Sequence, residues 1–177
     1  MKLVILDRDG TINHDSDHYI KSLDEWRPIK GSIEAIARLT QADYRVVVAT
    51  NQSAISRGLI TTRGLFEIHE ALQRAAVQAG GRVDAFFFCP HTETANCQCR
   101  KPKPGMLLEV AQRFNVSLKD TYMVGDSLKD VQAAAAAGAK PVLVLTGKGK
   151  KTHADGKLPP GTQVFPDLAA FAEHLAP

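Results

Sequence analysis

Two carboxylates, one residue apart, directly follow a short apolar segment at the start of the chain. Leu3 to Leu6 are four consecutive apolar residues, a run typical of a strand buried on both faces, and Asp7 and Asp9 come directly after it. Gly10 then permits a sharp turn. Such a pair could act as nucleophile and general acid or base, although aspartate also ends strands simply as a turn-forming residue. Residues at the other strand ends must decide between these interpretations.

Strand-like and helix-like segments alternate along the rest of the chain, which predicts an α/β fold. We expect a Rossmann-like, mostly parallel sheet flanked by helices, with the carboxyl ends of the strands at one edge. The length of 177 residues suits a single domain spanning 1–177. Segments 12–30 and 147–161 are predicted to be irregular loops, and Ser32 is predicted to cap a helix. The expected strands are 3–6, 45–50, 83–88, 122–125 and 141–145, and a last helix is expected near 168–175.

Polar residues at successive strand ends could form one site, because ligands of open α/β sheets bind beyond the carboxyl ends of the strands. Thr50 ends the second strand, Lys101 follows the third, and Asp126 follows the fourth, with Asp130 one helical turn later. Each alone could be a strand-ending hydroxyl, a solvated charge or a helix cap. Together with the first two carboxylates they supply a nucleophile, oxygen ligands for Mg²⁺, and two groups that hold phosphate oxygens. Asp9 suits the acid and base role of such a phosphoryl transfer.

The three cysteines of the chain lie in one short stretch together with a histidine. Cys89, His91, Cys97 and Cys99 have the spacing C-x-H-x₅-C-x-C. Three thiolates and one imidazole complete the tetrahedral ligand set of a structural Zn²⁺ and leave no position open for water. The alternative, small buried apolar cysteines, fits poorly with the polar residues between them. The sequence therefore predicts a structural zinc loop.

Four segments at the strand ends resemble, in order, the four motifs of the haloacid dehalogenase superfamily of phosphatases. The resemblance implies that Asp7 is the nucleophile and Asp9 the general acid and base. It also implies Mg²⁺ bound by Asp7, the Asp9 carbonyl and Asp126, with Asp130 supporting them. It further implies that Thr50 and Lys101 bind the phosphate, and we expect Asn51 and Ser53 to bind the substrate as well. The four segments are Asp7 to Thr11, Thr50 to Gln52, Lys101 to Pro104, and Gly125 to Asp130.

Within this superfamily, two segments resemble the D-glycero-D-manno-heptose-1,7-bisphosphate 7-phosphatase family. These are the zinc loop that runs into 100–106, and 50–58, in which Ala54 and Ser56 replace the usual Gly and Ala. Both substitutions exchange small residues, so the family assignment stands while the preferred anomer stays open. Histidinol-phosphate phosphatases share the zinc loop and remain the alternative. The two usual places for a cap domain, 12–30 and 89–99, are too short for one, so we expect a capless enzyme acting on a small sugar bisphosphate.

Without a cap, the second phosphate of such a substrate is the largest remaining feature to recognise. Arg57 follows the second motif and Arg100 precedes Lys101. The planar guanidinium of arginine suits a pair of phosphate oxygens. We therefore predict that Arg100, together with Arg57, binds the distal 1-phosphate. The simpler interpretation is that Arg57 is a surface charge and that Arg100 braces the zinc loop.

Two other functional classes compete with a small-molecule phosphatase. A receiver domain would need no acid or base two residues from its phosphorylated aspartate, so Asp9 disfavours it. A nucleic-acid module or polynucleotide 3′-phosphatase could use Lys148, Lys150 and Lys151, but that run fits a solvated loop and no aromatic stacking surface accompanies it. The net charge of +3 and the lack of a long apolar run predict no nucleic-acid partner and no membrane segment. We expect a cytoplasmic monomer.

Overall fold

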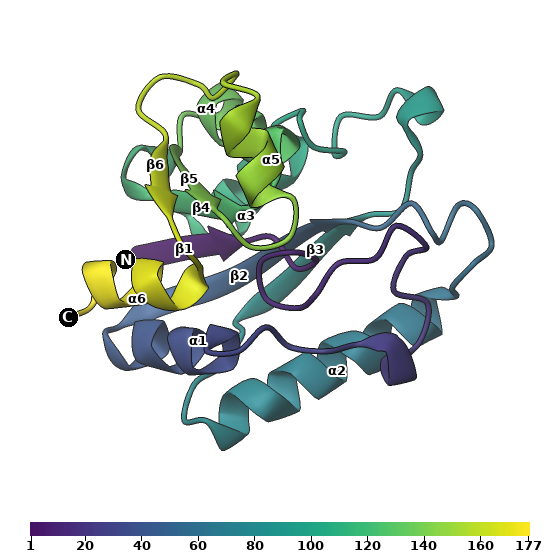
Figure 1. Ribbon diagram of the computed structural model, residues 1–177, viewed down its shortest axis with the longest axis horizontal. Helices are drawn as coiled ribbons and strands as arrows, with labels where there is room; N and C mark the ends of the chain where they lie inside the picture. The colour runs from purple at the N-terminus through teal and green to yellow at the C-terminus, as the bar shows by residue number, and fades with distance from the viewer.

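One six-stranded, fully parallel sheet organises the molecule. The computed structural model describes all residues, 1–177, and the strand order is β3-β2-β1-β4-β5-β6. From β1 the chain first builds outward through β2 to β3 and then returns to the other side of β1 with β4 (Figure 1). The end of β1 is therefore the topological switch point, where such sheets bind ligands. The strands are β1 Lys2–Leu6, β2 Tyr44–Asn51, β3 Ala85–Cys89, β4 Tyr122–Gly125, β5 Lys140–Val144 and β6 Gln163–Phe165.

Helices cover both faces of the sheet and create two hydrophobic layers. Alternate residues of β1 face opposite ways: Val4 and Leu6 pack with α1, α2 and α6, whereas Leu3 and Ile5 pack with α3 and α4. Figure 1 shows these two groups of helices on opposite sides of the sheet, with α5 on the side of α3 and α4. No helix combines the length and the apolar character that crossing a membrane requires. The helices are α1 Ser32–Gln41, α2 Thr62–Gln78, α3 Gly105–Phe114, α4 Leu128–Ala137, α5 Gly149–Ala154 and α6 Leu168–Leu175.

The predicted parallel α/β architecture is confirmed, and three local predictions are wrong. The segment 147–161 is not wholly irregular, because it contains α5, and a sixth strand follows it. The lysine-rich α5 is held by tertiary contacts: the Thr152 hydroxyl donates to the Asp126 carbonyl at 3.1 Å. Ser32 does not cap α1; Gly31 occupies that position, and the Ser32 hydroxyl instead donates to the Ile12 carbonyl at 2.6 Å. This bond ties the loop after β1 to the start of α1.

Both places where a cap domain would be inserted contain only short connections. Segment 12–30 has a single 3₁₀ turn, Leu23–Glu25, and the stretch between β3 and α3 has another, Glu93–Ala95. The expectation of a capless fold is confirmed. The carboxyl edge of the sheet is thus bordered by loops and by the start of α4, with no inserted domain over it.

Candidate active site

The carboxyl ends of β1, β2 and β4 border a cavity of about 440 Å³. Nearly all of the residues that the sequence nominates for chemistry or substrate binding line this cavity, although they come from four separate segments. Arg57 is the exception, because it does not line the cavity. The nominated residues that do so are Asp7, Asp9, Thr50, Asn51, Ser53, Arg100, Lys101, Asp126 and Asp130.

Lys101 is a buried cation at the floor of the cavity, with only 2% of its side chain exposed. Its Nζ donates to Asp7 Oδ1 at 2.9 Å, to Asp130 Oδ1 at 2.6 Å and to the Ala49 carbonyl at 2.8 Å. Burial acts to lower the pKa of Lys101, but the charges of Asp130 and Asp7 outweigh it, so the pKa is raised. Lys101 is therefore an ammonium ion whose three protons are all in use.

Three carboxylates at this floor exceed the positive charge available to them. The carboxylate oxygens of Asp7, Asp126 and Asp130 lie within 4.8 Å of one another. Burial, followed by the charge of Asp130, raises the pKa of Asp7 to about 7, against the opposing effect of Lys101. Burial, then the charges of Asp130 and Asp7, raises the pKa of Asp126 to about 8. Clustered oxygen donors with surplus negative charge fit a hard divalent cation.

Glycines let the backbone approach Asp126 closely. Gly10 has a φ of +83°, and a Cβ there would lie 2.1 Å from Asp126 Oδ2. Gly147 has a φ of +51°, and a Cβ there would lie 2.2 Å from the same oxygen. Any side chain at either position would thus both collide with the carboxylate and require a left-handed backbone. The backbone N–H of Lys148 then donates to Asp126 Oδ2 at 2.7 Å.

Asp130 connects the start of α4 to the buried lysine. Its Oδ2 accepts from the backbone N–H of Ser127 at 3.0 Å, as in a capping box, and also from the Ser127 hydroxyl at 2.7 Å. Its Oδ1 accepts from Lys101. One carboxylate therefore both begins a helix and orients the cation beside Asp7.

Asp9 is held by four hydrogen bonds from three side chains. Arg8 donates from Nε at 2.9 Å and from Nη2 at 3.1 Å, Asn13 Nδ2 donates at 2.9 Å, and Gln52 Nε2 donates at 3.0 Å. Burial acts to raise the pKa of Asp9, but the Arg8 charge and these hydrogen bonds outweigh it and lower the pKa. In this arrangement Asp9 is an ionised carboxylate and a proton acceptor. It has to take up a proton before it can donate one.

The polar residues at the end of β2 differ in how available they are to a ligand. The Thr50 hydroxyl accepts from Gln52 Nε2 at 2.9 Å and keeps its own proton free to donate. The Asn51 amide is already engaged: Nδ2 donates to the Lys101 carbonyl at 3.0 Å, and Oδ1 accepts from the Lys101 N–H at 3.1 Å. Asn51 thus braces the backbone of Lys101 while it lines the cavity.

The predicted zinc ligands converge in the loop after β3. Cys89, His91, Cys97 and Cys99 offer three sulfur atoms and one nitrogen within 4.8 Å of one another, and none of the thiols forms a disulfide. The Sγ atoms of Cys89 and Cys97 are 3.6 Å apart, and Cys99 Sγ lies 3.4 Å from His91 Nδ1. These four donors can hold one soft metal ion.

Several lining residues carried no recognisable signal in the sequence. Asp15 and Tyr19, from the loop after β1, and Lys129, from α4, line the cavity. Lys148 also lines it, and its Nζ pairs with Asp15 Oδ2 at 3.3 Å. Lys148 is solvated as predicted, with 59% of its side chain exposed, but it also belongs to the edge of the cavity. The sequence offered one indication that Lys148 lies at the site: it comes shortly after the strand expected at 141–145, where the other site residues also follow strands.

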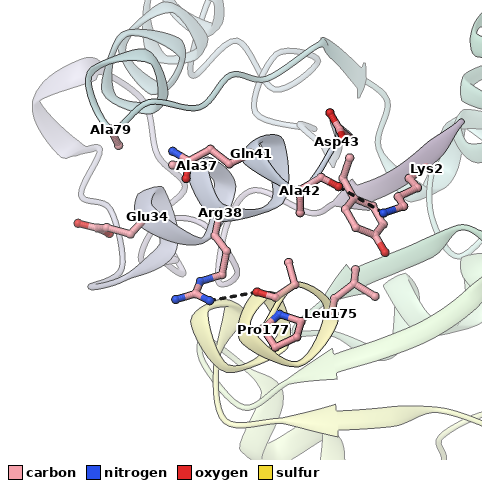
Figure 2. Close-up of a pocket in the computed structure, with 12 residues that line it drawn as sticks. Lys2, Glu34, Ala37, Arg38, Gln41, Ala42, Asp43, Ala79, Leu175 and Pro177 are labelled. Carbon is pink, nitrogen blue, oxygen red and sulfur yellow. Dashed lines mark hydrogen bonds between the residues drawn. The ribbon is translucent and has the colours of Figure 1, made fainter.

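A larger cavity, about 820 Å³, lies at the opposite edge of the sheet and contains none of the nominated residues (Figure 2). It lies between α1 and the end of α6, where Arg38 donates to the Ala176 carbonyl at 3.0 Å. Lys2 donates to the Ala42 carbonyl at 3.5 Å nearby. No group of three or more metal-ligating side chains occurs there. The chemistry therefore concentrates in the smaller cavity.

Comparison with known proteins agrees with this geometry. A family model described as HAD-hydrolase-like matches residues 98–171. The chain is 58% identical over 175 residues to the D-glycero-beta-D-manno-heptose-1,7-bisphosphate 7-phosphatase of Bordetella bronchiseptica, covering 99% of this chain and 98% of that one. It is 54% identical over 177 residues to the protein of the same name from Neisseria meningitidis serogroup A, covering 99% and 95%. The chain belongs to the D-glycero-beta-D-manno-heptose-1,7-bisphosphate 7-phosphatase family.

Solved structures of the heptose-bisphosphate phosphatase family share the fold along the whole chain. The D,D-heptose 1,7-bisphosphate phosphatase of B. bronchiseptica, crystallised with magnesium and phosphate, superposes with a TM-score of 0.97 at 58% identity, covering 99% of this chain and 98% of that one. The enzyme of Burkholderia thailandensis superposes with a TM-score of 0.80 at 51% identity, covering 99% and 98%. The resemblance to this family, predicted from the zinc loop that runs into 100–106 and from 50–58, is confirmed.

Proposed function

We propose that this chain is a Mg²⁺-dependent phosphatase that removes the 7-phosphate of D-glycero-β-D-manno-heptose 1,7-bisphosphate through an aspartyl phosphate on Asp7. The observation that carries the proposal is the buried contact between Lys101 and Asp7, which pairs a nucleophile with a fixed phosphate-binding cation. The names of relatives more than half identical over the full length supply the substrate and the β anomer. We propose one domain, residues 1–177, with this one active site.

The oxygen donors at the floor fit magnesium. The carboxylates of Asp7 and Asp126 and the carbonyl of Asp9 would bind the ion, and Asp130 would support them from behind through Lys101. When bound, Mg²⁺ neutralises charge on the phosphoryl oxygens. Support comes from the surplus of negative charge and from the magnesium and phosphate in the related crystal structure.

The residues of the chain divide the reaction into two displacements at phosphorus. In the first, an Asp7 oxygen forms a bond to phosphorus and the bond to the sugar oxygen breaks. Asp9, which has first taken up a proton from water or from the preceding turnover, gives that proton to the sugar oxygen. In the second, water attacks phosphorus, Asp9 takes a proton from it, and Asp7 leaves as a carboxylate. The Thr50 hydroxyl holds a phosphoryl oxygen, and Lys101 would hold another by exchanging one of its present contacts for it. The products are inorganic phosphate and the heptose 1-phosphate.

We assign structural zinc to Cys89, His91, Cys97 and Cys99. Four tetrahedral ligands placed 2.0 to 2.3 Å from Zn²⁺ lie roughly 3.3 to 3.8 Å apart. Most sulfur and nitrogen separations in the cluster are of this size, between 3.4 and 3.6 Å, as for Cys97 to Cys99 at 3.5 Å. The ion would fix the loop that leads into Arg100 and Lys101.

Selectivity for a bisphosphate would come from the rim of the cavity. Arg100 lines the cavity, and its Nη1 donates to the His91 carbonyl at 3.1 Å, so the guanidinium is anchored on the zinc loop. We propose that Arg100, with Arg57 beside it, binds the distal 1-phosphate, and that Asn51 and Ser53 contact the substrate near the reacting end. We also propose a cytoplasmic monomer that supplies heptose 1-phosphate to lipopolysaccharide precursor biosynthesis.

A phosphate-release panel tests the proposal. Heptose 1,7-bisphosphate, histidinol phosphate and a 3′-phosphorylated oligonucleotide are assayed with Mg²⁺ under identical conditions. We expect the bisphosphate to give the highest kcat/KM and ³¹P NMR to show that the 1-phosphate stays on the product. Preferred hydrolysis of histidinol phosphate or of the oligonucleotide would reject the proposed substrate.

A further inference from the structure

A single carboxylate at the rim of the active site is surrounded by three cations from three different segments. Glu93, in the turn Glu93–Ala95, accepts from Lys129 Nζ at 3.2 Å and lies 3.9 Å from Arg57 Nη2. Arg100 Nη2 also donates to Glu93. Arg57 follows β2, Arg100 follows β3 and Lys129 follows β4, so only the fold brings the three cations to one place.

Two of these cations belong to the catalytic cavity, whereas the carboxylate does not. Arg100 and Lys129 line the 440 Å³ cavity and also an adjacent cavity of about 160 Å³. Glu93 lines only the smaller one. The carboxylate therefore holds the cations from outside the active site, at the boundary between the two cavities.

Arg100 retains binding capacity that the protein does not use. Its Nε is buried and has no hydrogen-bond partner, although its two terminal nitrogens reach Glu93 and the His91 carbonyl. A buried, unpaired donor is costly, and an anionic oxygen would satisfy it. Three cations around one carboxylate also leave a net positive charge, which suits a phosphate dianion better than a single carboxylate.

We propose that Glu93 is a built-in competitor for the distal phosphate: it occupies Arg57, Arg100 and Lys129 in the free enzyme and yields them when the substrate binds. Lys129 thereby becomes a third cation of the distal subsite. This inference rests on the proposed function, because it requires a substrate with a second phosphate.

Competition by Glu93 favours product release, and the reason lies in the reaction itself. The distal phosphate is not removed, so the product still carries it and could remain bound to the same cations. Return of Glu93 to those cations replaces the lost phosphate contacts and favours release of the product. The ion pairs of Glu93 with Arg57 and Lys129 are solvent-exposed and therefore weak, so these two partners can be exchanged readily.

The test compares Glu93→Gln with the parent enzyme and with Glu67→Gln. Glu67 is an exposed carboxylate on α2 that pairs with Arg63 at 3.3 Å, so its substitution controls for the loss of one exposed, ion-paired carboxylate away from the site. For Glu93→Gln we expect KM for the bisphosphate and the inhibition constant of the heptose 1-phosphate product both to fall roughly threefold to tenfold. KM for a heptose 7-monophosphate should stay unchanged, and Glu67→Gln should match the parent on every substrate.

Lys129→Gln provides the opposite change. It should raise KM for the bisphosphate and weaken product inhibition, and it should change KM for the monophosphate by a smaller factor, because Lys129 lines the active-site cavity. Unchanged or higher KM for the bisphosphate in Glu93→Gln, or an equal shift on both substrates, would overturn the proposal.

Failure of the proposed function is recognised separately, because the parent would then not hydrolyse the bisphosphate. In that case the binding of inorganic pyrophosphate to the parent and to Glu93→Gln is measured by calorimetry. Tighter binding by Glu93→Gln than by the parent supports a competing carboxylate, and equal or weaker binding contradicts it.

Discussion

The floor and the rim of the active site both consist of cations paired with carboxylates, but they differ in exposure. At the floor, Lys101 has 2% of its side chain exposed and is fixed by Asp7 and Asp130. At the rim, the Lys129 side chain is 47% exposed and its partner Glu93 is 59% exposed. Charge interactions are strong where water is excluded and weak where it is not. The comparison suggests that the floor is arranged for chemistry before the substrate arrives, whereas the rim exchanges its partners on binding.

Substitution at the floor should give the largest effect. Asp7→Asn keeps the shape of the side chain but cannot form the aspartyl phosphate, so we expect kcat to fall by on the order of 10³-fold or more. Lys101 would keep Asp130 and the Ala49 carbonyl as partners, so circular dichroism and the melting temperature should show a folded protein. Steady turnover by the pure variant would contradict the assignment of Asp7 as the nucleophile.

Metal removal tests the charge surplus of the floor. EDTA should abolish activity, and added Mg²⁺ should restore it. In the metal-free folded protein the pKa of Asp7 is about 7 and that of Asp126 is about 8, whereas aspartates of the unfolded chain have a pKa of about 4. Between these values the folded state binds more protons than the unfolded state, so the free energy of unfolding falls as pH rises.

Thermal melts at a series of pH values measure this dependence. We expect Tm of the metal-free protein to fall between about pH 5 and about pH 8, and Mg²⁺ to raise Tm most at the upper end. A Tm that is independent of Mg²⁺ at the upper end would show that these carboxylates do not hold the ion.

The zinc loop should affect the rim more than the floor. Elemental analysis should find about one zinc per chain, and Cys97→Ala should lose it. We expect Tm to fall by roughly 5 °C or more and KM to rise more for the bisphosphate than for a monophosphate, because Arg100 is anchored on the His91 carbonyl. A variant without zinc that keeps the Tm and the substrate preference of the parent would show that zinc neither stabilises the fold nor positions Arg100.

Substitution at the rim should give the smallest effect. Arg100→Ala loses a charge-assisted contact to the distal phosphate, so kcat/KM for the bisphosphate should fall by roughly tenfold to a hundredfold. The effect of Arg57→Ala should be smaller, because Arg57 does not line the cavity. Both variants are assayed with the bisphosphate and with a heptose 7-monophosphate. Equal losses on both substrates would mean that these arginines serve the reacting phosphate or the fold.

The floor could be predicted from the sequence because strand ends are local signals. Apolar runs that stop at Asp7, Thr50 and Asp126 place these residues at one sheet edge once the strands are parallel. Lys101 was found by its motif, but its two carboxylate partners are 94 and 29 residues away, and only the fold brings the three together.

The rim could not be predicted in the same way. Glu93 and Lys129 lie in polar segments, where a charged residue is normally solvated, and their contact spans 36 residues. The helix α5 was missed for a related reason: its glycine and lysines resemble a loop, and the hydrogen bond from Thr152 to the Asp126 carbonyl that holds it is a tertiary contact. Exposed pairs and tertiary contacts of this kind leave no periodic pattern in the sequence.

The central claim, that Asp7 carries the phosphoryl group, is tested most directly by chemical trapping. Borohydride reduces an aspartyl phosphate to homoserine, and peptide mass spectrometry locates the modified residue. Asp9→Asn is used beside the parent. It removes the acid of the first displacement and the base of the second, so it accumulates the intermediate when the second displacement is slowed more than the first. We predict homoserine at position 7 only when Mg²⁺ and heptose 1,7-bisphosphate are both present. Homoserine at another position, or continued turnover in borohydride with Asp7 unmodified, would contradict the account.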